Sequence, residues 1–411
     1  MANKPKIRFK GFDDAWEQRK LLSCIQSITD FRGRTPKKLG MDWSESGYLA
    51  LSALNVKDGY IDFSQDVHYG NQELYDKWMS GKELHRGQVL FTTEAPMGNV
   101  AQVPDNKGYI LSQRTIAFDV EEKILSENFL ATLLRTPNVF NDLIALSSGG
   151  TAKGVSQKSL SGLDVVIPKN IDEQNKLADY FINLDNLITL HQRKCDQMKE
   201  LKKYMLTKMF PQNGAKVPEI RFDGFIDDWE QRKLGDVCSR VQGNDGRMEL
   251  PTLTISASNG WMKQEDRFSG NIAGKEQKNY TLLHKGELSY NHGNSKLAKY
   301  GTVFSLQSYE EALVPRVYHS FKVEEGNTDF IEYYFATKLP DRELGKLISS
   351  GARMDGLLNI GYKEFMGIQL LFPKTKEQEC IANYFRNLDH LITLHQRKCD
   401  QMKELKKYML T

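Results

Sequence analysis

Apolar residues recur along one stretch of the chain with the spacing of a long helix. The steps between them alternate between three and four residues with one irregular step, which is typical of a coiled-coil seam. At 1.5 Å per residue, a helix from 172 to 209 would extend roughly 57 Å. The apolar positions are Leu177, Phe181, Leu184, Ile188, His191, Cys195, Met198, Leu201, Met205 and Met209.

This helical stretch is written twice in the chain. The segment LITLHQRKCDQMKELKKYMLT occupies 187–207 and recurs letter for letter at 391–411. A second repeat places IRFKGFDDAWEQRKL at 7–21 and IRFDGFIDDWEQRKL at 220–234; we call these segments the N-terminal motifs. An internal repeat of this kind predicts a duplicated architecture. The apolar stripe of one helix has its natural partner in the other copy, so we expect an antiparallel helix pair with pseudo-twofold symmetry.

The segments between the repeats are variable and indicate mixed α/β domains. Short strand-like runs (QVLFTT, GYIDF, GYILS, TIAFDV) alternate with turn residues, and helical patterns follow (ENFLATLLRT, NVFNDLIALSS, and TDFIEYYFATKL in the second half). The predicted fold class is α+β, with two mixed domains separated by the helices. The expected divisions are a first domain at 1–167, a helix at 168–210, a linker at 211–219, a second domain at 220–372 and a helix at 373–411.

Composition restricts the setting of the protein. The 411 residues carry a net charge of +3, which neither requires nor excludes a nucleic-acid partner. Five cysteines without a CxxC pair do not form a disulfide framework. The sequence shows neither an apolar run of the roughly 20 residues that span a bilayer nor the apolar core of a signal peptide. We therefore expect a cytoplasmic protein that has no membrane partner.

The duplication itself suggests a mode of action. Identical surfaces bind identical partners, so two equal helices imply two copies of one partner. Two divergent domains on one scaffold imply two different targets at a fixed separation. Duplex DNA offers such targets, since half-sites on one face lie about 34 Å apart. In this interpretation a change of helix length alters the spacing between half-sites and leaves their identity unchanged.

These features resemble the specificity subunits of type I restriction–modification systems. The resemblance rests on the GRTP loop at 33–36, the FxGFxxxWExxKL pattern of the N-terminal motifs and the PxxxEQ…LITLHQRK helix, and it extends over essentially the whole chain. One departure is that the second copy stops at Thr411, whereas the first continues with Lys208, Met209 and Phe210. This departure leaves the end of the second helix open.

The resemblance implies a non-catalytic subunit with two target-recognition domains. Such a subunit reads a bipartite, asymmetric sequence in double-stranded DNA, with one domain for each half-site. It joins two methyltransferase subunits and up to two restriction subunits. The expected cofactors, S-adenosylmethionine, ATP and Mg²⁺, then belong to the partners and not to this chain. The sequence fits this expectation, because it carries no G-x-x-x-x-G-K-[ST] nucleotide loop and no Asn/Asp-Pro-Pro-Tyr/Phe methyltransferase motif.

Candidate DNA-binding residues lie in Gly-rich and basic loops of both domains. Arginine or lysine in such loops can contact guanine, and glutamine or asparagine can contact adenine. A simple turn remains an alternative for the loops at 31–38 and 240–247. Arg114 and Arg316 occupy matching places in LSQR and LVPR, which favours phosphate contact or fold support over base reading. The candidates are Arg32, Arg34, Thr35, Lys37, Lys38, Gln113, Arg114 and Lys153 in the first domain, and Arg240, Gln242, Asn244, Arg247, Asn291, His292, Asn294, Lys296, Arg316 and Arg353 in the second.

Two other functions and one metal site compete with this interpretation. Asp105, Glu121 and Lys123 satisfy the PD…ExK pattern of Mg²⁺-dependent nucleases, in which two carboxylates hold the metal. A scaffold that binds only proteins would have no salt-sensitive affinity for DNA. The His-Cys pairs of the two helices, at 191 and 195 and at 395 and 399, could form a tetrahedral zinc site, but packing in the helix seam is the favoured explanation.

Overall fold

A computed structural model describes residues 7–148, 153–212, 214–268, 274–293, 295–348 and 357–410. The chain forms two compact units: Met1–His191 together with Lys398–Thr411, and Gln192–Arg397. Each unit therefore combines one variable domain with a part of each long helix.

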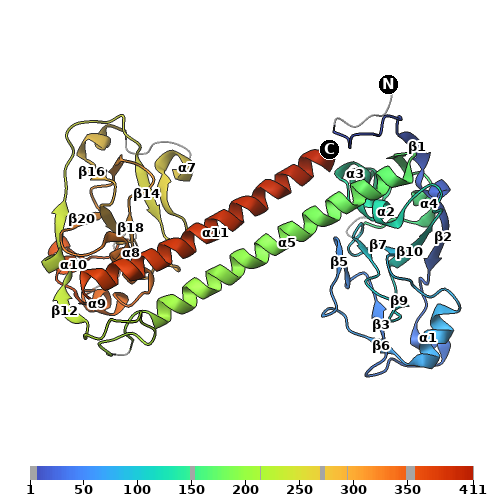
Figure 1. Cartoon of the computed structure of the whole chain (residues 1–411), viewed down its shortest axis with the longest axis horizontal. Helices are drawn as coiled ribbons and strands as arrows, with labels where there is room; N and C mark the ends of the chain where they lie inside the picture. The colour runs from blue at the N-terminus through green and yellow to red at the C-terminus, as the bar shows by residue number, and fades with distance from the viewer. Residues whose placement is uncertain are drawn as a thin grey trace. The chain divides into compact units, whose positions relative to one another are not determined.

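Two long helices confirm the expectation from the apolar stripe. They are α5 (Ile171–Lys208) and α11 (Thr375–Leu410), and Figure 1 shows each as a single unbroken helix. The start of α5 is capped by Asn170, whose side-chain oxygen accepts hydrogen bonds from the N–H groups of Asp172 and Glu173. This contact satisfies two donors that lack a partner inside the helix. None of the helices in the described residues is long and apolar enough to cross a bilayer.

The first domain is built around a four-stranded antiparallel sheet, and two of the strand-like runs of the sequence, QVLFTT and TIAFDV, form its middle. The strand order is β2 (Ile25–Asp30), β10 (Thr115–Val120), β7 (Val89–Thr92) and β8 (Val100–Gln102). Smaller sheets are β1 (Glu17–Lys20) with β11 (Asp164–Ile167), β6 (Tyr69–Gly70) with β3 (Tyr48–Leu51) and β9 (Ile110–Leu111), and β4 (Val56–Lys57) with β5 (Tyr60–Ile61). The helices are η1 (Leu21–Cys24), η2 (Pro36–Leu39), α1 (Gln72–Met79), α2 (Glu127–Leu134), α3 (Pro137–Leu146) and α4 (Gln157–Leu160).

The second domain repeats the central four-stranded sheet with other residues, and its smaller sheets differ in part from those of the first domain. Its four-stranded sheet has the order β13 (Cys238–Val241), β20 (His319–Val323), β17 (Leu288–Asn291) and β18 (Thr302–Ser305). Two-stranded sheets are β12 (Glu230–Lys233) with β21 (Gln369–Phe372), β14 (Leu253–Ser256) with β15 (Gly260–Lys263), and β16 (Thr281–His284) with β19 (Glu311–Val314). The helices are α6 (Leu234–Val237), α7 (Gln264–Phe268), η3 (Gly274–Asn279), α8 (Thr328–Ala336), α9 (Asp341–Lys346) and α10 (Tyr362–Met366). The predicted mixed α/β class is confirmed.

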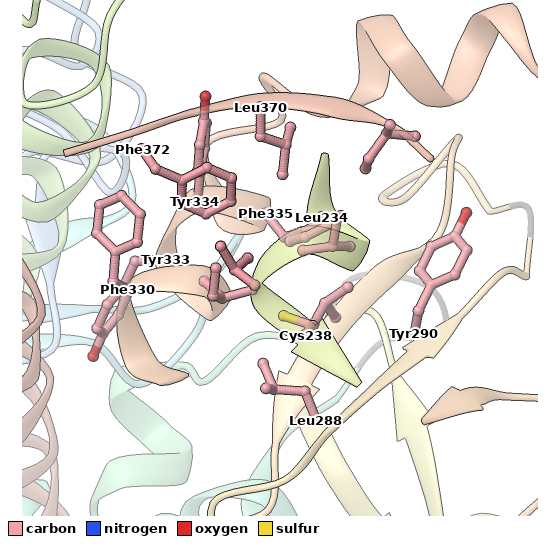
Figure 2. Close-up of a cluster of buried hydrophobic side chains, with 14 of the residues drawn as sticks. Leu234, Cys238, Leu288, Tyr290, Phe330, Tyr333, Tyr334, Phe335, Leu370 and Phe372 are labelled. Atoms are coloured by element: carbon pink, nitrogen blue, oxygen red, sulfur yellow. The ribbon is translucent and has the colours of Figure 1, made fainter. Parts of the chain in front are cut away.

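The core of the second unit joins its sheet to α8 and to the end of α5. Figure 2 shows Leu234, Cys238 and Leu288 close to the aromatic side chains of α8. Phe210, just beyond α5, is fully buried and stacks on Phe330 with ring centroids 5.6 Å apart. Full burial of one such side chain contributes roughly 1.5–3 kcal/mol, so the end of α5 is firmly anchored in this unit.

The helix seam differs from the sequence expectation at one position. Phe181, Leu184, Cys195 and Met209 are buried as predicted, but Leu201 is 38% exposed. The inward place after Met198 is taken by Lys202, whose ammonium group contacts Asp389 at 2.6 Å. With Lys202 in the seam, the spacing stays regular and the irregular step disappears. The aliphatic stem of a lysine can pack against apolar side chains while its charged end reaches a partner.

Candidate functional site

A buried ion pair joins the N-terminal motif to the long helix in each unit. Arg8 donates to both carboxylate oxygens of Glu173, at 2.6 and 2.8 Å, and the Trp16 indole donates to the same glutamate at 3.3 Å. Arg221 donates to both oxygens of Glu377, at 2.7 and 2.8 Å. The glutamate side chains are only 1% and 2% exposed. A bidentate pair of this kind fixes both position and angle.

The glutamine that follows each glutamate repeats a second pair of contacts. Gln174 donates to the carbonyl of Pro168 at 2.8 Å and accepts from the N–H of Ser126 at 2.9 Å. Gln378 likewise donates to the carbonyl of its preceding proline, and it accepts from the N–H of Asn327. Ser126 and Asn327 cap α2 and α8. The residues that carry the sequence repeat therefore fasten each domain to the start of its long helix.

The two helix segments inside each unit run antiparallel and make equivalent contacts. In the second unit Lys202 contacts Asp389 at 2.6 Å. In the first unit Lys406 contacts Asp185 at 2.5 Å. These pairs occupy the same positions in the two copies of the repeated segment.

The cysteines of the helices lie in the seam. Cys195 is fully buried, with its sulfur 3.8 Å from the carbonyl oxygen of Ile392, and Cys399 is fully buried near the carbonyl oxygen of Ile188. These positions match the packing interpretation. Within the described residues, no group of three or more His, Cys, Asp or Glu side chains is placed to hold a metal ion.

The first domain contains a hollow of about 350 Å³ where several chain segments meet. These segments are the loops that follow β2, β3, β5 and β7, the turn between β9 and β10, and α1, which contributes Trp78. Four residues predicted to bind DNA, although far apart in sequence, converge here. The lining residues are Arg34, Thr35, Pro36, Trp43, Ser52, Ala53, Leu54, Asp66, Trp78, Ala95, Ser112, Gln113 and Arg114.

Unusual backbone conformations concentrate around this hollow. Among the described residues five non-glycine residues have a positive φ, and three of them line it: Asp66 at 45°, Ala95 at 48° and Arg114 at 63°. Side chains make this region of conformational space unfavourable. Backbone strain of this kind tends to gather at functional sites, where the surrounding structure holds it in place.

The loop that follows β2 is braced by its own side chains. The Arg34 guanidinium lies 4.2 Å from the centre of the Phe31 ring and donates to the carbonyl of Trp78. Thr35 caps η2, and Lys38 donates to the carbonyl of Gly33 at 2.7 Å. The turn that was the alternative for this loop is therefore present.

The remaining candidates of the first domain are exposed. Arg32 pairs with Asp30 at 3.5 Å, and Lys37 is exposed. Lys153 is exposed and precedes Gly154, whose backbone forms a bridge with Glu94.

Gln113 and Arg114 lie side by side at the rim of the hollow. Gln113 donates to the carbonyl of Arg34 at 3.2 Å, so it links the turn to the loop after β2. The Nε of Arg114 lies 3.3 Å from a carboxylate oxygen of Glu94, and both side chains are about half exposed, at 54% and 46%.

The sheet registers show which positions of the two domains correspond. Phe91 lies opposite Ile116, and Tyr290 lies opposite His319. Because Phe91 and Tyr290 take the same place in the matching segments LHRGQVLF and LHKGELSY, Ile116 corresponds to His319. The pairing of β10 and β20 with their other neighbours, β2 and β13, gives the same correspondence. The offset between the N-terminal motifs, continued to the start of these strands, equates Ile25 with Cys238, and these residues lie opposite Val120 and Val323.

The expected match between Arg114 and Arg316 is wrong by one residue. Counted back two residues from Ile116 and His319, Arg114 corresponds to Val317, and Gln113 corresponds to Arg316. A short match such as LSQR with LVPR cannot detect a shift of one residue, whereas the hydrogen bonds of a sheet fix the register. The reason for regarding Arg114 as a residue that serves both domains alike therefore no longer holds.

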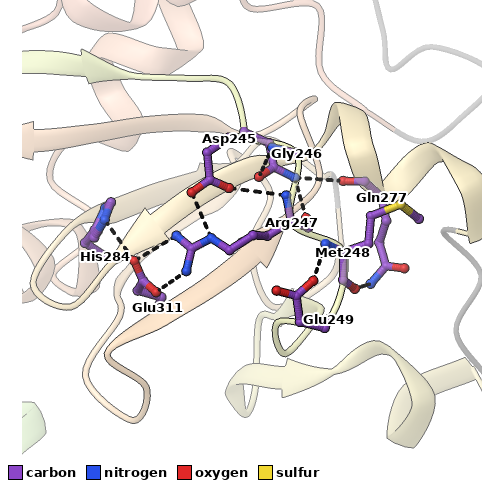
Figure 3. Close-up of polar contacts among 9 residues, drawn as sticks. Asp245, Gly246, Arg247, Met248, Glu249, Gln277, His284 and Glu311 are labelled. Atoms are coloured by element: carbon purple, nitrogen blue, oxygen red, sulfur yellow. Dashed lines mark hydrogen bonds and ion pairs between the residues drawn. The ribbon is translucent and has the colours of Figure 1, made fainter.

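In the second domain, Arg247 is held by carboxylates. Figure 3 shows its guanidinium between Asp245 and Glu311, with N–O distances of 2.8 Å to the first and 2.7 and 3.0 Å to the second. The hydrogen bonds from Arg247 lower the pKa of the Glu311 carboxyl. Asn244 donates to the carbonyls of Arg247 and Gln277 and so closes the turn.

Two further candidates of this loop are more accessible. Arg240 is exposed and lies 4.5 Å from the centre of the Tyr362 ring. Gln242 is exposed next to Gly243, whose carbonyl accepts a hydrogen bond from the N–H of Leu282.

His292 is a buried structural residue in this conformation. One of its ring nitrogens lies 2.8 Å from the carbonyl oxygen of Leu358, and the other lies 2.9 Å from that of Val317. It is 5% exposed and stacks on His319 with ring centres 4.9 Å apart. Neighbouring Asn291 donates to the carbonyl of Ile255 at 3.1 Å. Both side chains therefore support the backbone.

Lys296 and Arg316 are exposed in the second domain. Asn294 and Arg353 lie outside the described residues. In the first domain, sequence reasoning missed Trp43, Asp66 and Glu94, which lie in or beside the hollow. Because they come from separate loops without a shared motif, no local signal could have grouped them.

The residues of the nuclease pattern do not share a site. Asp105 pairs with Lys107 at 2.9 Å and accepts a hydrogen bond from Tyr109 at 3.0 Å. The hydrogen bond from Lys107 is the main cause of the lowered pKa of Asp105. Glu121 and Lys123 line a separate hollow of about 470 Å³, and Asp105 is not part of it. The two carboxylates that would hold Mg²⁺ are thus placed apart.

Known proteins of one family are similar to this chain over nearly its whole length. The sequence model of the family described as the type I restriction modification DNA specificity domain matches residues 14–200 and 226–404. The type I restriction enzyme MjaVIII specificity subunit of Methanocaldococcus jannaschii is 22% identical over 417 residues, which covers 96% of this chain and 91% of that protein. A putative MjaX specificity subunit of the same organism is 20% identical over 434 residues, covering 99% and 95%.

A solved structure shares the fold. The S subunit of a type I restriction–modification system from M. genitalium superimposes with a TM-score of 0.58 at 13% sequence identity. The match covers 99% of this chain and 97% of that one.

Proposed function

The chain belongs to the family of type I restriction–modification specificity subunits, and we propose that it reads a bipartite DNA sequence with one domain for each half-site. Members of this family are non-catalytic DNA-recognition subunits of restriction–modification complexes. The proposal concerns how this chain divides recognition between its two halves and what it assembles with.

One observation carries the division of recognition. The two domains share a sheet topology and the contacts that fasten them to the helices, yet equivalent positions at the sheet end hold different side chains, as with Arg114 and Val317. Base identity is read by side chains that reach base edges, while backbone contacts set orientation. Two similar frames with different surface residues therefore suit an asymmetric target.

The exposed apolar residues of the helices support two equivalent partner sites. Four helix positions carry large exposed apolar side chains in both units, and the first unit exposes Ile182 in addition. A surface of this kind typically marks a protein interface. The residues are Leu187, Leu190, Leu405 and Tyr408 in the first unit, and Leu391, Leu394, Leu201 and Tyr204 in the second.

We propose that these surfaces hold two methyltransferase subunits, and that up to two restriction subunits join them. The chemistry then resides in the partners, with S-adenosylmethionine serving methyl transfer and ATP and Mg²⁺ serving restriction. Each methyltransferase subunit would flip an adenine out of the stack for N6 methylation, as enzymes that modify bases in duplex DNA must do. The helices would set the number of bases between the half-sites.

The test is a map of methylated adenines, by single-molecule sequencing, in cells that carry this chain with its methyltransferase partner and in cells that lack it. We expect a new two-part motif with a fixed gap. Exchange of residues 220–372 for the second domain of another family member should replace one half-site and leave the other unchanged. A complex that purifies intact and marks no new motif would contradict the proposal.

A further inference from the structure

The rim of the hollow in the first domain presents one arginine that is held for contact with an external group. The Arg114 side chain is 54% exposed, and its Nε is paired with Glu94 at 3.3 Å. Among the described residues this is the only ion pair or hydrogen bond that the side chain makes. A guanidinium has five N–H donors in a planar fork, so an ion pair at Nε leaves the terminal amino groups available to an external partner.

Two other cations of the neighbouring loop, Arg34 and Lys38, are engaged by groups of the domain itself. Arg34 lies against the Phe31 ring and donates to the carbonyl of Trp78. Lys38 donates to a backbone carbonyl of its own loop. Arg114 differs from both because its partner is a half-exposed carboxylate at the rim, which can orient the guanidinium without burying it.

We infer that Arg114 reads a guanine in the half-site of the first domain and that Glu94 positions it. This inference rests on the proposed function. Arginine commonly recognises guanine through two hydrogen bonds, to O6 and N7 in the major groove. A guanidinium whose Nε side is held by a carboxylate presents the two terminal nitrogens that such a contact needs. Glu94 is a positioning residue, since it acts through Arg114.

The backbone and the register support a role specific to this domain. Arg114 has φ at 63°, an unfavourable conformation for a side chain that also occurs at Asp66 and Ala95 around the same hollow. The equivalent position of the second domain is Val317, which is 46% exposed and cannot donate a side-chain hydrogen bond. A phosphate contact needed in both half-sites would require a donor at both positions. A base contact in one half-site requires it only here.

The test uses the complete complex of this chain with its methyltransferase partner and maps methylated adenines for the wild type and for Arg114→Gln. We expect one guanine of one half-site to lose its preference, with discrimination against the other bases falling about tenfold to a hundredfold. The affected half-site should be the one that survives exchange of the second domain. Glu94→Gln should weaken the preference at the same position by a smaller factor.

A matched control is Arg86→Gln. It removes the same charge from an exposed arginine of the same domain that does not line the hollow, and it should leave the motif unchanged. If Arg114→Gln fails to assemble, Arg114→Lys replaces it. Lysine keeps the charge but loses the fork, so the guanine preference should fall without disappearing.

Two outcomes would overturn the inference. One is an unchanged motif in an Arg114 variant that still methylates DNA. The other is a uniform fall in methylation with every motif position unchanged, which would identify a phosphate contact. Both leave the proposed function standing, because the wild type would still yield a two-part motif. Only the absence of such a motif in the wild type would remove the function itself.

Discussion

The two halves of the chain are nearly identical where the long helices begin, and they differ where the central sheets end. At the first place Arg8 with Glu173 and Arg221 with Glu377 form the same buried bidentate pair. At the second, Arg114 corresponds to Val317. Contacts that hold a domain on a helix serve both halves equally, whereas side chains that read two different half-sites have to differ. Equivalent residues that are the same in both halves therefore indicate a role in assembly, and equivalent residues that differ indicate a role in DNA recognition.

Some equivalent positions of the sheets and the helix seam have the same structural role in both halves but hold different side chains or contacts. In the sheets, Ile116 of the first half corresponds to His319 of the second. In the helix seam, Asp185 contacts Lys406 and Arg135, whereas Asp389 contacts Lys202 and the hydroxyl of Tyr333. The same backbone arrangement is thus stabilised by different side chains in the two halves. Three sets of variants measure how much the junction, the sheet and the helix seam each contribute to the free energy of unfolding.

The largest effect is expected from removal of the buried glutamate. Glu377→Ala leaves the Arg221 guanidinium without its carboxylate partner, with only the carbonyl of Asp227 still accepting from it, and should lower the free energy of unfolding by about 3–5 kcal/mol. Glu173→Ala should cost less, because Trp16 is half-buried and can turn to water. The Trp229 indole donates to Glu377 at 3.3 Å and is 2% exposed, so its N–H stays buried without an acceptor in Glu377→Ala. Urea unfolding of the purified chain measures both losses.

A control for this comparison is Arg232→Ala, which breaks an ion pair whose glutamate, Glu325, is 60% exposed. Water can replace this contact, so the loss should be much smaller than for Glu377→Ala. Equal losses for the buried and the exposed pair would show that the junction is not what holds the domain on the helix.

An intermediate effect should appear in acid and only in the second half. Burial lowers the pKa of His319 from its ordinary value of 6.5 to about 4, so the folded state holds the neutral ring. The unfolded chain then binds more protons as the pH falls from about 6.5 to about 4, and up to roughly 2–3 kcal/mol of stability is lost over this window.

The variant that tests this expectation is His319→Gln, whose amide can still donate to the carbonyl of Ile360, which lies 2.8 Å from the histidine ring in the wild type. Its unfolding free energy, measured by urea titration across the same pH range, should fall less steeply than that of the wild type. The first half has Ile116 at this position and contributes no such slope. Parallel pH curves for variant and wild type would refute the assignment.

The smallest effect is expected in the helix seam. Lys202→Met leaves Asp389 with the Tyr333 hydroxyl alone, whereas Lys406→Met leaves Asp185 with Arg135 at 2.9 Å. Since partly exposed ion pairs contribute about 0.2–1 kcal/mol, both losses should be small, with the larger one for Lys202→Met. Thermal unfolding of the two variants in one buffer measures the difference. A larger loss for Lys406→Met would mean that Arg135 does not substitute for the missing lysine.

The helix seam shows how far pattern reasoning reaches. The apolar spacing located α5 and α11, but it placed Leu201 inside, where the structure has Lys202. A lysine is not counted as apolar, yet its long stem can occupy a seam position when a carboxylate receives its charge. The pattern alone could not show that Asp389 lies opposite.

The candidate site shows a similar limit. Arg34, Thr35, Gln113 and Arg114 were selected from two separate loops, and the fold brings all four to one hollow. Asn244 and His292 were selected by the same reasoning, yet their side chains support the backbone. Residue type indicates what a side chain can bind, but burial and neighbouring groups determine whether it is available.

The sequence by itself determined the duplicated architecture, the long helices, four strands of the first domain and the family, because each of these leaves a periodic or repeated trace along the chain. The tertiary structure alone decided which arginine stands at the rim of the hollow, that Glu94 holds it, and that its counterpart in the second half is Val317. The physical reason is that register and convergence depend on hydrogen bonds and packing between segments distant in sequence. Such contacts leave no local pattern among the residues that make them.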